Sequence, residues 1–125
     1  MSRGTASRRA RSCCSTTSST GGLRLPRESS STLGLWAELR VAARDTGNAA
    51  VFPDATQGAI IDDHTPLLRA GIPAVDLIDW TDPGHRVTDT LDKLSPASVD
   101  AVGETLIDLV RRLDDEYSCT RGRGR

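Results

Sequence analysis

Two aspartates and a histidine, Asp62, Asp63 and His64, stand side by side just ahead of a helix-like run. Carboxylate and imidazole groups gathered in one place can bind a metal ion or transfer protons. A second histidine, His85, lies in a polar loop, and Asp89 follows it by four residues. Because zinc takes three or four ligands of these types, the spacing is compatible with a metal or acid–base site without specifying one.

Each of these residues also has a structural interpretation. Asp62 or Asp63 can cap a helix by accepting hydrogen bonds from free backbone amides, a role worth about 1 kcal/mol. A loop histidine such as His85 is commonly just exposed. The sequence has no Gly-x-Ser-x-Gly elbow for a nucleophilic serine and no phosphate-binding glycine loop. Spacing alone favours capping and leaves the metal or acid–base site open.

The elements that would position these groups follow from hydrophobic periodicity and from turn residues. Helices are predicted over residues 33–44, from the aspartate pair to about residue 70, and from Ser95 to residue 113, with a strand over residues 74–79. The loop of His85 follows the carboxyl end of that strand, where sites lie in open α/β sheets. One strand is too little for a sheet, and two amphipathic helices need a layer to cover. We therefore expect an incomplete α/β domain.

Charge and composition divide the chain. Residues 1–32 contain 14 Ser or Thr, six Arg and one Glu without hydrophobic periodicity, which predicts no packed structure. Residues 33–113 carry 7 basic and 13 acidic side chains, a net charge of −6. Such an acidic body disfavours nucleic acid and suits cations. No apolar run approaches eighteen residues, so we expect no membrane-spanning segment.

The run DDHTPLLRAGIPAVDLID, followed by His85 and DTLDKLS, resembles the C-terminal third of a zinc-enzyme family. This family comprises the co-catalytic zinc aminopeptidases, metallopeptidase family twenty-eight, and the related glutaminyl-peptide cyclotransferases. The resemblance extends over residues 23–113 and includes LRLPRESS, LWAELRVAARDTG and QGAIIDDH. It implies an α/β/α sandwich with a mixed central sheet, here incomplete, and zinc as cofactor. Its limits give the expected boundaries of the domain. The flanking sequences lack an apolar pattern, so we expect residues 1–22 to be disordered or non-native and residues 114–125 to be a disordered tail.

The resemblance assigns roles to the polar residues. His85 matches the last zinc-binding histidine of the family. Asp62 matches the acidic residue of the cyclotransferases in the hydrogen-bonded carboxylate network beside the zinc, a position that is Ser in many aminopeptidases. Asp62 is the candidate catalytic group. Asp63 and His64 match the shared Asp-His pair that orients the loop and helix start, and Asp89 matches the loop that supports the zinc-binding histidine.

The chain departs from the family pattern in two places. Gly84 and Arg86 flank His85, where family members commonly have an aromatic residue before the histidine and Thr after it. The other zinc ligands and the glutamate base belong upstream of residue 23, and residues 1–22 contain no Asp, Glu or His. One histidine cannot hold zinc tightly, so we expect this 125-residue chain to be a truncated or frame-shifted fragment without activity.

The functional expectation is a zinc-dependent aminopeptidase that hydrolyses N-terminal peptide bonds through a zinc-activated water. The stretch DTLDKLSP after the histidine favours hydrolysis over the alternative, cyclisation of N-terminal glutamine to pyroglutamate. A further alternative is a non-catalytic relic or a binding module that uses the Arg-rich tracts. The expected partner is a peptide substrate bound once the missing part completes the site, with no nucleic acid and no membrane.

Overall fold

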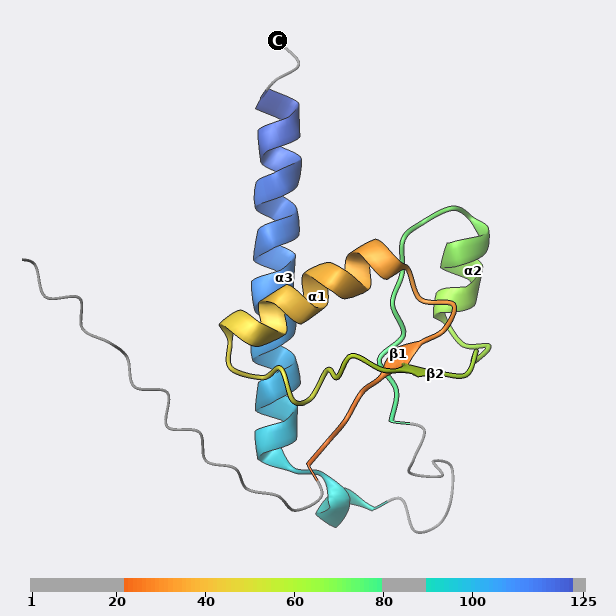
Figure 1. Cartoon of the computed structure of the whole chain (residues 1–125), viewed down its shortest axis with the longest axis vertical. Coiled ribbons are helices and arrows are strands. Elements are labelled where there is room, and N and C mark those ends of the chain that lie inside the picture. Colours follow the sequence, from red (N-terminus) through yellow and green to blue (C-terminus); the bar gives the residue numbers. More distant parts are fainter. Residues whose placement is uncertain (1–21, 80–89, 123–125) are drawn as a thin grey trace, which may run out of the picture.

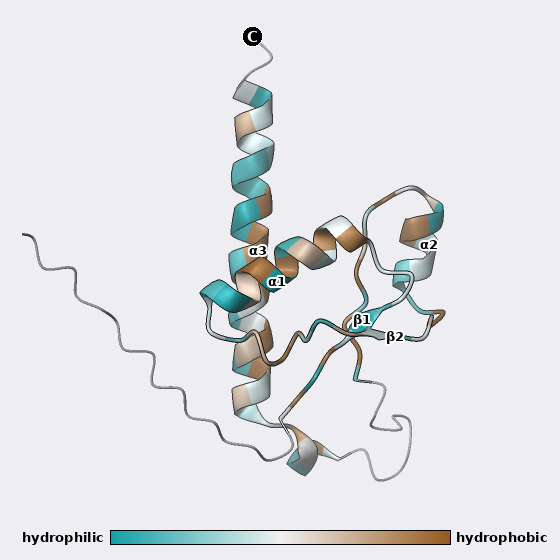
Figure 2. Ribbon diagram, in the orientation of Figure 1, coloured by the Kyte–Doolittle hydropathy of each residue, from teal (hydrophilic) through white to brown (hydrophobic). Residues whose placement is uncertain are grey.

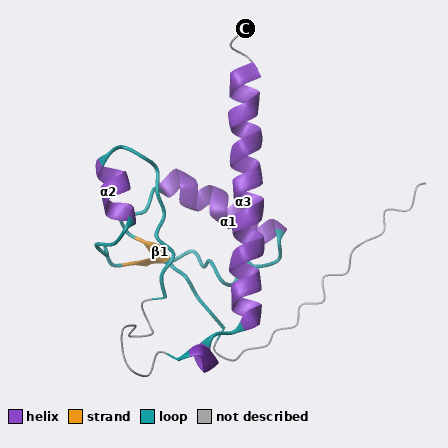
Figure 3. Cartoon of the chain, turned by 180° about the vertical axis from the view of Figure 1, so that it is seen from behind, coloured by secondary structure: helices purple, strands orange, loops and turns teal. Residues whose placement is uncertain are grey.

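The computed structural model describes residues 22–79 and 90–122. Helix α3 is the longest element, α1 crosses it, and both views place α2 beside the strand pair and away from α3 (Figures 1 and 3). In chain order the elements are β1 (Arg27–Glu28), α1 (Leu33–Asp45), β2 (Thr56–Gln57), α2 (His64–Arg69), a 3₁₀ turn (Leu91–Lys93) and α3 (Pro96–Gly122).

Helix α1 confirms the prediction for residues 33–44. Its buried positions are Trp36, Leu39, Ala42 and Ala43, which recur at helical spacing and form one apolar face. The helix ends at Asp45, and Gly47 follows with a φ of +82°, a left-handed conformation that glycine adopts without steric cost. The backbone amides of Gly47 and Asn48 donate to carbonyls in the last turn of α1, which closes the helix end.

The core lies where α1 crosses α3 and meets the chain on either side of α1 (Figure 2). Leu25, Phe52 and Leu109 pack there against the buried face of α1. The Trp36 and Phe52 rings meet edge to face, with centroids 6.2 Å apart. Each fully buried apolar side chain of this size contributes about 1.5–3 kcal/mol, so this small cluster supplies most of the hydrophobic stabilisation.

A polar contact joins the end of α1 to α3. Thr105 is fully buried and its hydroxyl donates to the carbonyl of Ala101 at 2.8 Å. The amide of the Asn48 side chain donates to the same carbonyl at 3.1 Å. Arg112 binds the carboxylates of Asp45 and Asp108, which fixes the crossing of the two helices from the solvent side.

The strand predicted over residues 74–79 is an extended segment instead of a strand, which corrects the sequence analysis. The two strands in the described residues, β1 and β2, pair in parallel over two residues each. Side chains take the place of a strand ladder along residues 74–79. The amides of Ala74 and Asp76 bind the hydroxyls of Thr32 and Ser31, and Gln57 donates to the Ile78 carbonyl at 3.2 Å.

The last part of the Ser-rich segment is packed, contrary to the prediction from its composition. The composition of residues 1–32 predicts no packed structure, yet Leu25, Glu28 and Ser31 are all buried. The prediction failed because this stretch packs through one leucine and a polar network, which hydrophobic periodicity does not detect. Residues 1–21, where the N-terminal segment was expected to be disordered or non-native, lie outside the described residues.

Helix α3 begins as predicted but runs further. Ser95 precedes the helix and its hydroxyl accepts the Ser98 amide at 3.4 Å. The helix continues to Gly122, so residues 114–122, expected to be disordered, are helical. They are exposed, and local contacts such as the Arg121 guanidinium over the Tyr117 ring, 5.2 Å from its centroid, accompany the helix there.

The predicted apolar stripe of α3 is covered only where α1 crosses it. Leu109 is buried, whereas Val99 and Val110 are 59% and 63% exposed. The described residues therefore contain a smaller sheet, and bury less of α3, than the expected three-layer sandwich requires. No helix in the two described ranges has the length and apolarity needed to cross a bilayer.

Candidate functional site

Asp62, Asp63 and His64 form the turn that leads into α2. The amide of Asp63 donates to Asp62 Oδ1 at 2.8 Å, and the amide of Asp62 donates to the Thr65 hydroxyl at 3.2 Å. Asp62 and Asp63 are exposed, whereas His64, the first residue of the helix, is buried. The turn thus presents two carboxylates outward and one imidazole inward.

The capping interpretation holds only in part. Asp63 occupies the N-cap position, but within the described residues its side chain makes no capping hydrogen bond. Its backbone has helical angles, φ −57° and ψ −25°, instead of the extended angles from which an N-cap side chain reaches the next turn. Asp62 bonds the amide of its neighbour instead. Capping therefore does not account for both aspartates.

His64 contacts the segment around β1 through one ring nitrogen. Its Nε2 lies 3.0 Å from the Ser30 hydroxyl and 3.2 Å from Oε2 of Glu28. The other ring nitrogen, Nδ1, faces Oδ2 of Asp76 at 3.6 Å. The imidazole therefore lies between two carboxylates that come from opposite sides of the turn in the sequence.

Glu28 is a buried carboxylate with a full set of donors. Burial raises its pKa, but hydrogen bonds from Ser30, Ile60 and Ser31 outweigh that effect and lower the pKa to about 2. Backbone amides of these three residues donate at 2.8–3.1 Å, and the Ser30 and Ser31 hydroxyls donate to Oε2 at 2.7 and 3.1 Å. Glu28 is therefore ionised at neutral pH and ties β1 to the loop before the turn.

The pKa of Asp76 is shifted in the opposite direction from that of Glu28. Burial is the largest cause that raises its pKa, and the charges of Asp62, Glu28 and Asp63 raise it further. The charge of His64 acts in the opposite direction but does not cancel them. Asp76 thus favours its protonated form more than an ordinary aspartate does, and it is electrostatically linked to both acids of the turn.

Ser30, His64 and Asp76 have the residue types of a serine-nucleophile triad, but the proton positions oppose that function. Because the single hydroxyl proton of Ser30 goes to Glu28, at 2.7 Å, Ser30 Oγ accepts in its contact with His64 Nε2, and Nε2 carries the proton. His64 Nε2 has no free lone pair with which to activate the serine, so we assign Ser30 to the hydrogen-bond network.

Of the residues that the sequence analysis selected, the structure brings Asp62, Asp63 and His64 together. His85 and Asp89 lie outside the described residues, so their roles stay predictions. Asp79, at the end of the extended segment, lines a separate hollow of about 550 Å³ with Leu23, Leu94 and Val99. That hollow is mainly apolar and does not contain the acid turn.

The described residues do not fit a zinc ion. No group of three or more His, Cys, Asp or Glu side chains in residues 22–79 and 90–122 is arranged to hold a metal. Glu28, His64 and Asp76 are close together, but Glu28 already accepts five hydrogen bonds and both nitrogens of His64 face carboxylates. These three residues are therefore assigned no metal.

Comparison with known proteins agrees with the resemblance found in the sequence. The sequence profile of peptidase family M28 matches residues 15–110. The chain belongs to peptidase family M28. A solved structure, the glutaminyl cyclase of an Acidobacteriales bacterium, matches with a TM-score of 0.68 and 31% identity. Among curated proteins no significant match was found.

The match to the cyclase structure also defines how much of the family domain is present. It covers 75% of this M28 chain and 35% of the cyclase chain, so the chain spans about a third of that relative. The fold is therefore that of part of an M28 domain. Members of this family are generally zinc-dependent. The expected resemblance to aminopeptidases and cyclotransferases is confirmed at the level of the family.

Sequence reasoning missed Glu28 and Asp76. Glu28 is the single acid among the first 32 residues, within a stretch rich in Ser and Arg. Asp76 interrupts the apolar run AVDLID at its third position. An isolated acid in a segment that must pack is a sign of a buried partner, because an unpaired buried charge is costly. That rule would have selected Asp76 but not Glu28, because the composition of residues 1–32 predicts no packed structure.

Proposed function

We propose that this M28 chain supplies the C-terminal part of an exopeptidase site that hydrolyses N-terminal peptide bonds in a zinc-dependent reaction. The observation that carries the proposal is the turn of residues 61–64, which exposes Asp62 and anchors it through the buried His64. An exposed carboxylate on a buried support has the arrangement that a proton-transferring group next to a substrate requires.

Asp62 is the proposed catalytic group. Its Oδ1 is fixed by the Asp63 amide, so the carboxylate has a defined orientation at the surface of the turn. Asp63 and His64 support it, and His85 and Asp89 keep the roles that the family resemblance implies, as zinc ligand and as neighbour of that ligand. Since the described residues do not form a zinc site, they are assigned acid and positioning roles only.

The reaction belongs to a whole M28 domain, within an α/β/α sandwich that this chain completes only in part. The chain spans about a third of the glutaminyl cyclase that it matches, and the expected remaining ligands have no counterpart in residues 22–79 and 90–122. We therefore propose that the 125-residue chain by itself does not turn over a peptide substrate.

Transfer of the segment into its relative tests this function. Residues 23–113 would replace the corresponding third of the Acidobacteriales glutaminyl cyclase, and circular dichroism melting would establish that the chimaera folds. We expect zinc-dependent release of amino acids from aminoacyl anilides, above the rate of the parent cyclase and abolished by a chelator. A folded chimaera that releases no amino acid would contradict the hydrolytic function.

Cyclisation of N-terminal glutamine is the second candidate, because the matched structure is a glutaminyl cyclase. The same chimaera separates the two reactions, since cyclisation releases ammonia from a glutaminyl peptide and hydrolysis releases a free amino acid. Cyclisation without hydrolysis would favour the second candidate. A folded chimaera inactive in both assays would favour a non-catalytic role for the segment.

A further inference from the structure

Three charged side chains meet beneath the acid turn, and each comes from a different part of the chain. Glu28 belongs to β1, His64 begins α2, and Asp76 lies in the extended segment after α2. The Glu28 side chain is fully buried, and the side chains of His64 and Asp76 are 4% and 16% exposed. Such a group of charges is stable only when its protons are shared so that each buried atom has a partner.

The hydrogen-bond geometry fixes one proton of this cluster. Glu28 Oε2 lies 3.2 Å from His64 Nε2. The Ser30 hydroxyl donates its proton to Glu28 Oε2, so Ser30 Oγ can only accept from His64 Nε2, which must be a donor. This holds whether the imidazole is neutral or charged, because both forms can carry a proton on Nε2. The Ser30 hydroxyl, 3.0 Å from the same nitrogen, holds the ring in this orientation.

The second ring nitrogen of His64 meets a buried oxygen of Asp76. Nδ1 of His64 and Oδ2 of Asp76 are buried, face each other at 3.6 Å, and have no hydrogen-bond partner among the described residues. Without a proton between them, two lone pairs would oppose each other away from water. With one proton, on either atom, both are satisfied after a small approach.

We propose that Glu28, His64 and Asp76 form a buried proton-sharing cluster that fixes the acid turn, and that His64 is thereby the positioning residue for the Asp62 carboxylate. The importance of Asp62 for catalysis rests on the proposed function. The cluster and its hold on the turn rest on the contacts alone.

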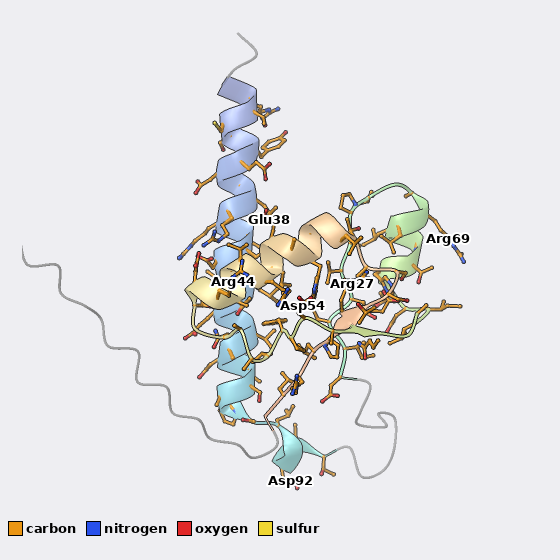
Figure 4. All side chains as sticks on the ribbon, viewed as in Figure 1. Arg27, Glu38, Arg44, Asp54, Arg69 and Asp92 are labelled. Atoms are coloured by element: carbon orange, nitrogen blue, oxygen red, sulfur yellow. The ribbon has the colours of Figure 1, made fainter. Side chains whose placement is uncertain are left out.

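The surrounding charges strengthen this assignment. Asp62 and Asp63 are exposed on the turn, and their negative charges raise the pKa of Asp76. Arg27 lies beside Glu28 on β1, but its guanidinium donates to the carbonyls of Ser29 and Ser31, at 2.9 and 3.0 Å (Figure 4). Arg69 projects outward from α2 (Figure 4). Within the described residues, His64 is the titratable side chain whose ring nitrogens contact both Glu28 and Asp76.

Nitrogen NMR of the full 125-residue chain tests the cluster directly, because the sequence has two histidines and His85→Asn leaves His64 alone. Long-range proton–nitrogen spectra report which ring nitrogen carries a proton. We expect an Nε2-protonated pattern for His64 throughout about pH 5–8. Averaged tautomers, as in a free histidine, would overturn the proposal, and so would a chain in which His64 is exposed because the chain does not fold.

The positioning role has a second readout at the turn itself. The Asp63 amide is held by Asp62 Oδ1, so its hydrogen exchange reports the order of the turn. We expect His64→Gln, which keeps a donor toward Glu28 and loses the contact with Asp76, to speed exchange of this amide tenfold or more. The amides of α1 should keep their protection, and the exposed Asp54→Asn should change neither.

The outcomes separate this inference from the proposed function. If exchange at Asp63 is unchanged in His64→Gln, the cluster does not hold the turn and the inference fails, whatever the chimaera does. If the NMR results are as expected and a folded chimaera is inactive, the cluster stands and the proposed function fails.

Discussion

Replacement of Glu28 by Gln is the sharpest test of the buried charge network. The carboxylate accepts five hydrogen bonds, and an amide of the same shape can accept at only one of its two ends. Its NH₂ group would face backbone or hydroxyl donors in place of an acceptor. His64 Nε2 would also lose its ionised partner, so the variant combines lost hydrogen bonds with donor-to-donor contacts.

The size of the effect follows from the pKa of Glu28. A pKa lowered from 4.5 to about 2 corresponds to about 3 kcal/mol in favour of the folded state with an ionised carboxylate. Because the folded-state pKa lies below the unfolded one, this contribution is complete above about pH 4.5. It is lost as the pH falls through about 2. Asp76, whose pKa is raised, contributes to stability with the opposite pH dependence. It is present in both the native chain and the Glu28→Gln variant.

Urea unfolding at several pH values measures the difference. We expect Glu28→Gln to lower the free energy of unfolding by about 3 kcal/mol at pH 5 and by much less near pH 2, where about half of the native carboxyl groups are protonated. Glu38→Gln makes the same chemical change on the exposed surface of α1 and should shift the free energy by less than about 0.5 kcal/mol (Figure 4). A deficit for Glu28→Gln that is the same at both pH values would refute the assignment of an ionised, strongly hydrogen-bonded Glu28.

The same unfolding measurement tests the core and one turn. Leu39→Ala, at a side chain that is 1% exposed, should cost about 2–5 kcal/mol, whereas Leu33→Ala, at 68% exposure, should cost under about 0.5 kcal/mol. Equal effects would place the core elsewhere. Gly71→Ala should cost about 1–2 kcal/mol because its φ of +77° is left-handed, and Gly34→Ala in α1 should be neutral or stabilising. A neutral Gly71→Ala would mean that α2 does not end as described.

The helices could be predicted from the sequence because their signals are local. Trp36 and Leu39 mark one face of α1, and Gly47 and Gly71 mark the ends of two helices, all by spacing and backbone preference. The extent of α3 beyond Leu113 could not be predicted from its apolar stripe, because residues 114–122 continue the helix while remaining exposed.

The site could be predicted only in outline. The adjacency of Asp62, Asp63 and His64 is a fact of the sequence, and the family resemblance indicated a supporting role for His64. Its partners come from residues 36 positions before and 12 positions after it, and no spacing rule connects them. The strand expected over residues 74–79 failed for the same reason, since the hydroxyls that replace a ladder come from Ser31 and Thr32.

The most direct test of the central claim is the turnover of the chimaera carrying Asp62→Asn. A proton-transferring carboxylate contributes about 10²–10⁴-fold, so kcat should fall at least about a hundredfold with KM and melting temperature little changed. Asp54→Asn, at a side chain that is 88% exposed, is the matched control and should keep the parent kcat. An Asp62→Asn chimaera with the same kcat as the chimaera without this substitution would contradict the assignment of this turn to the active site.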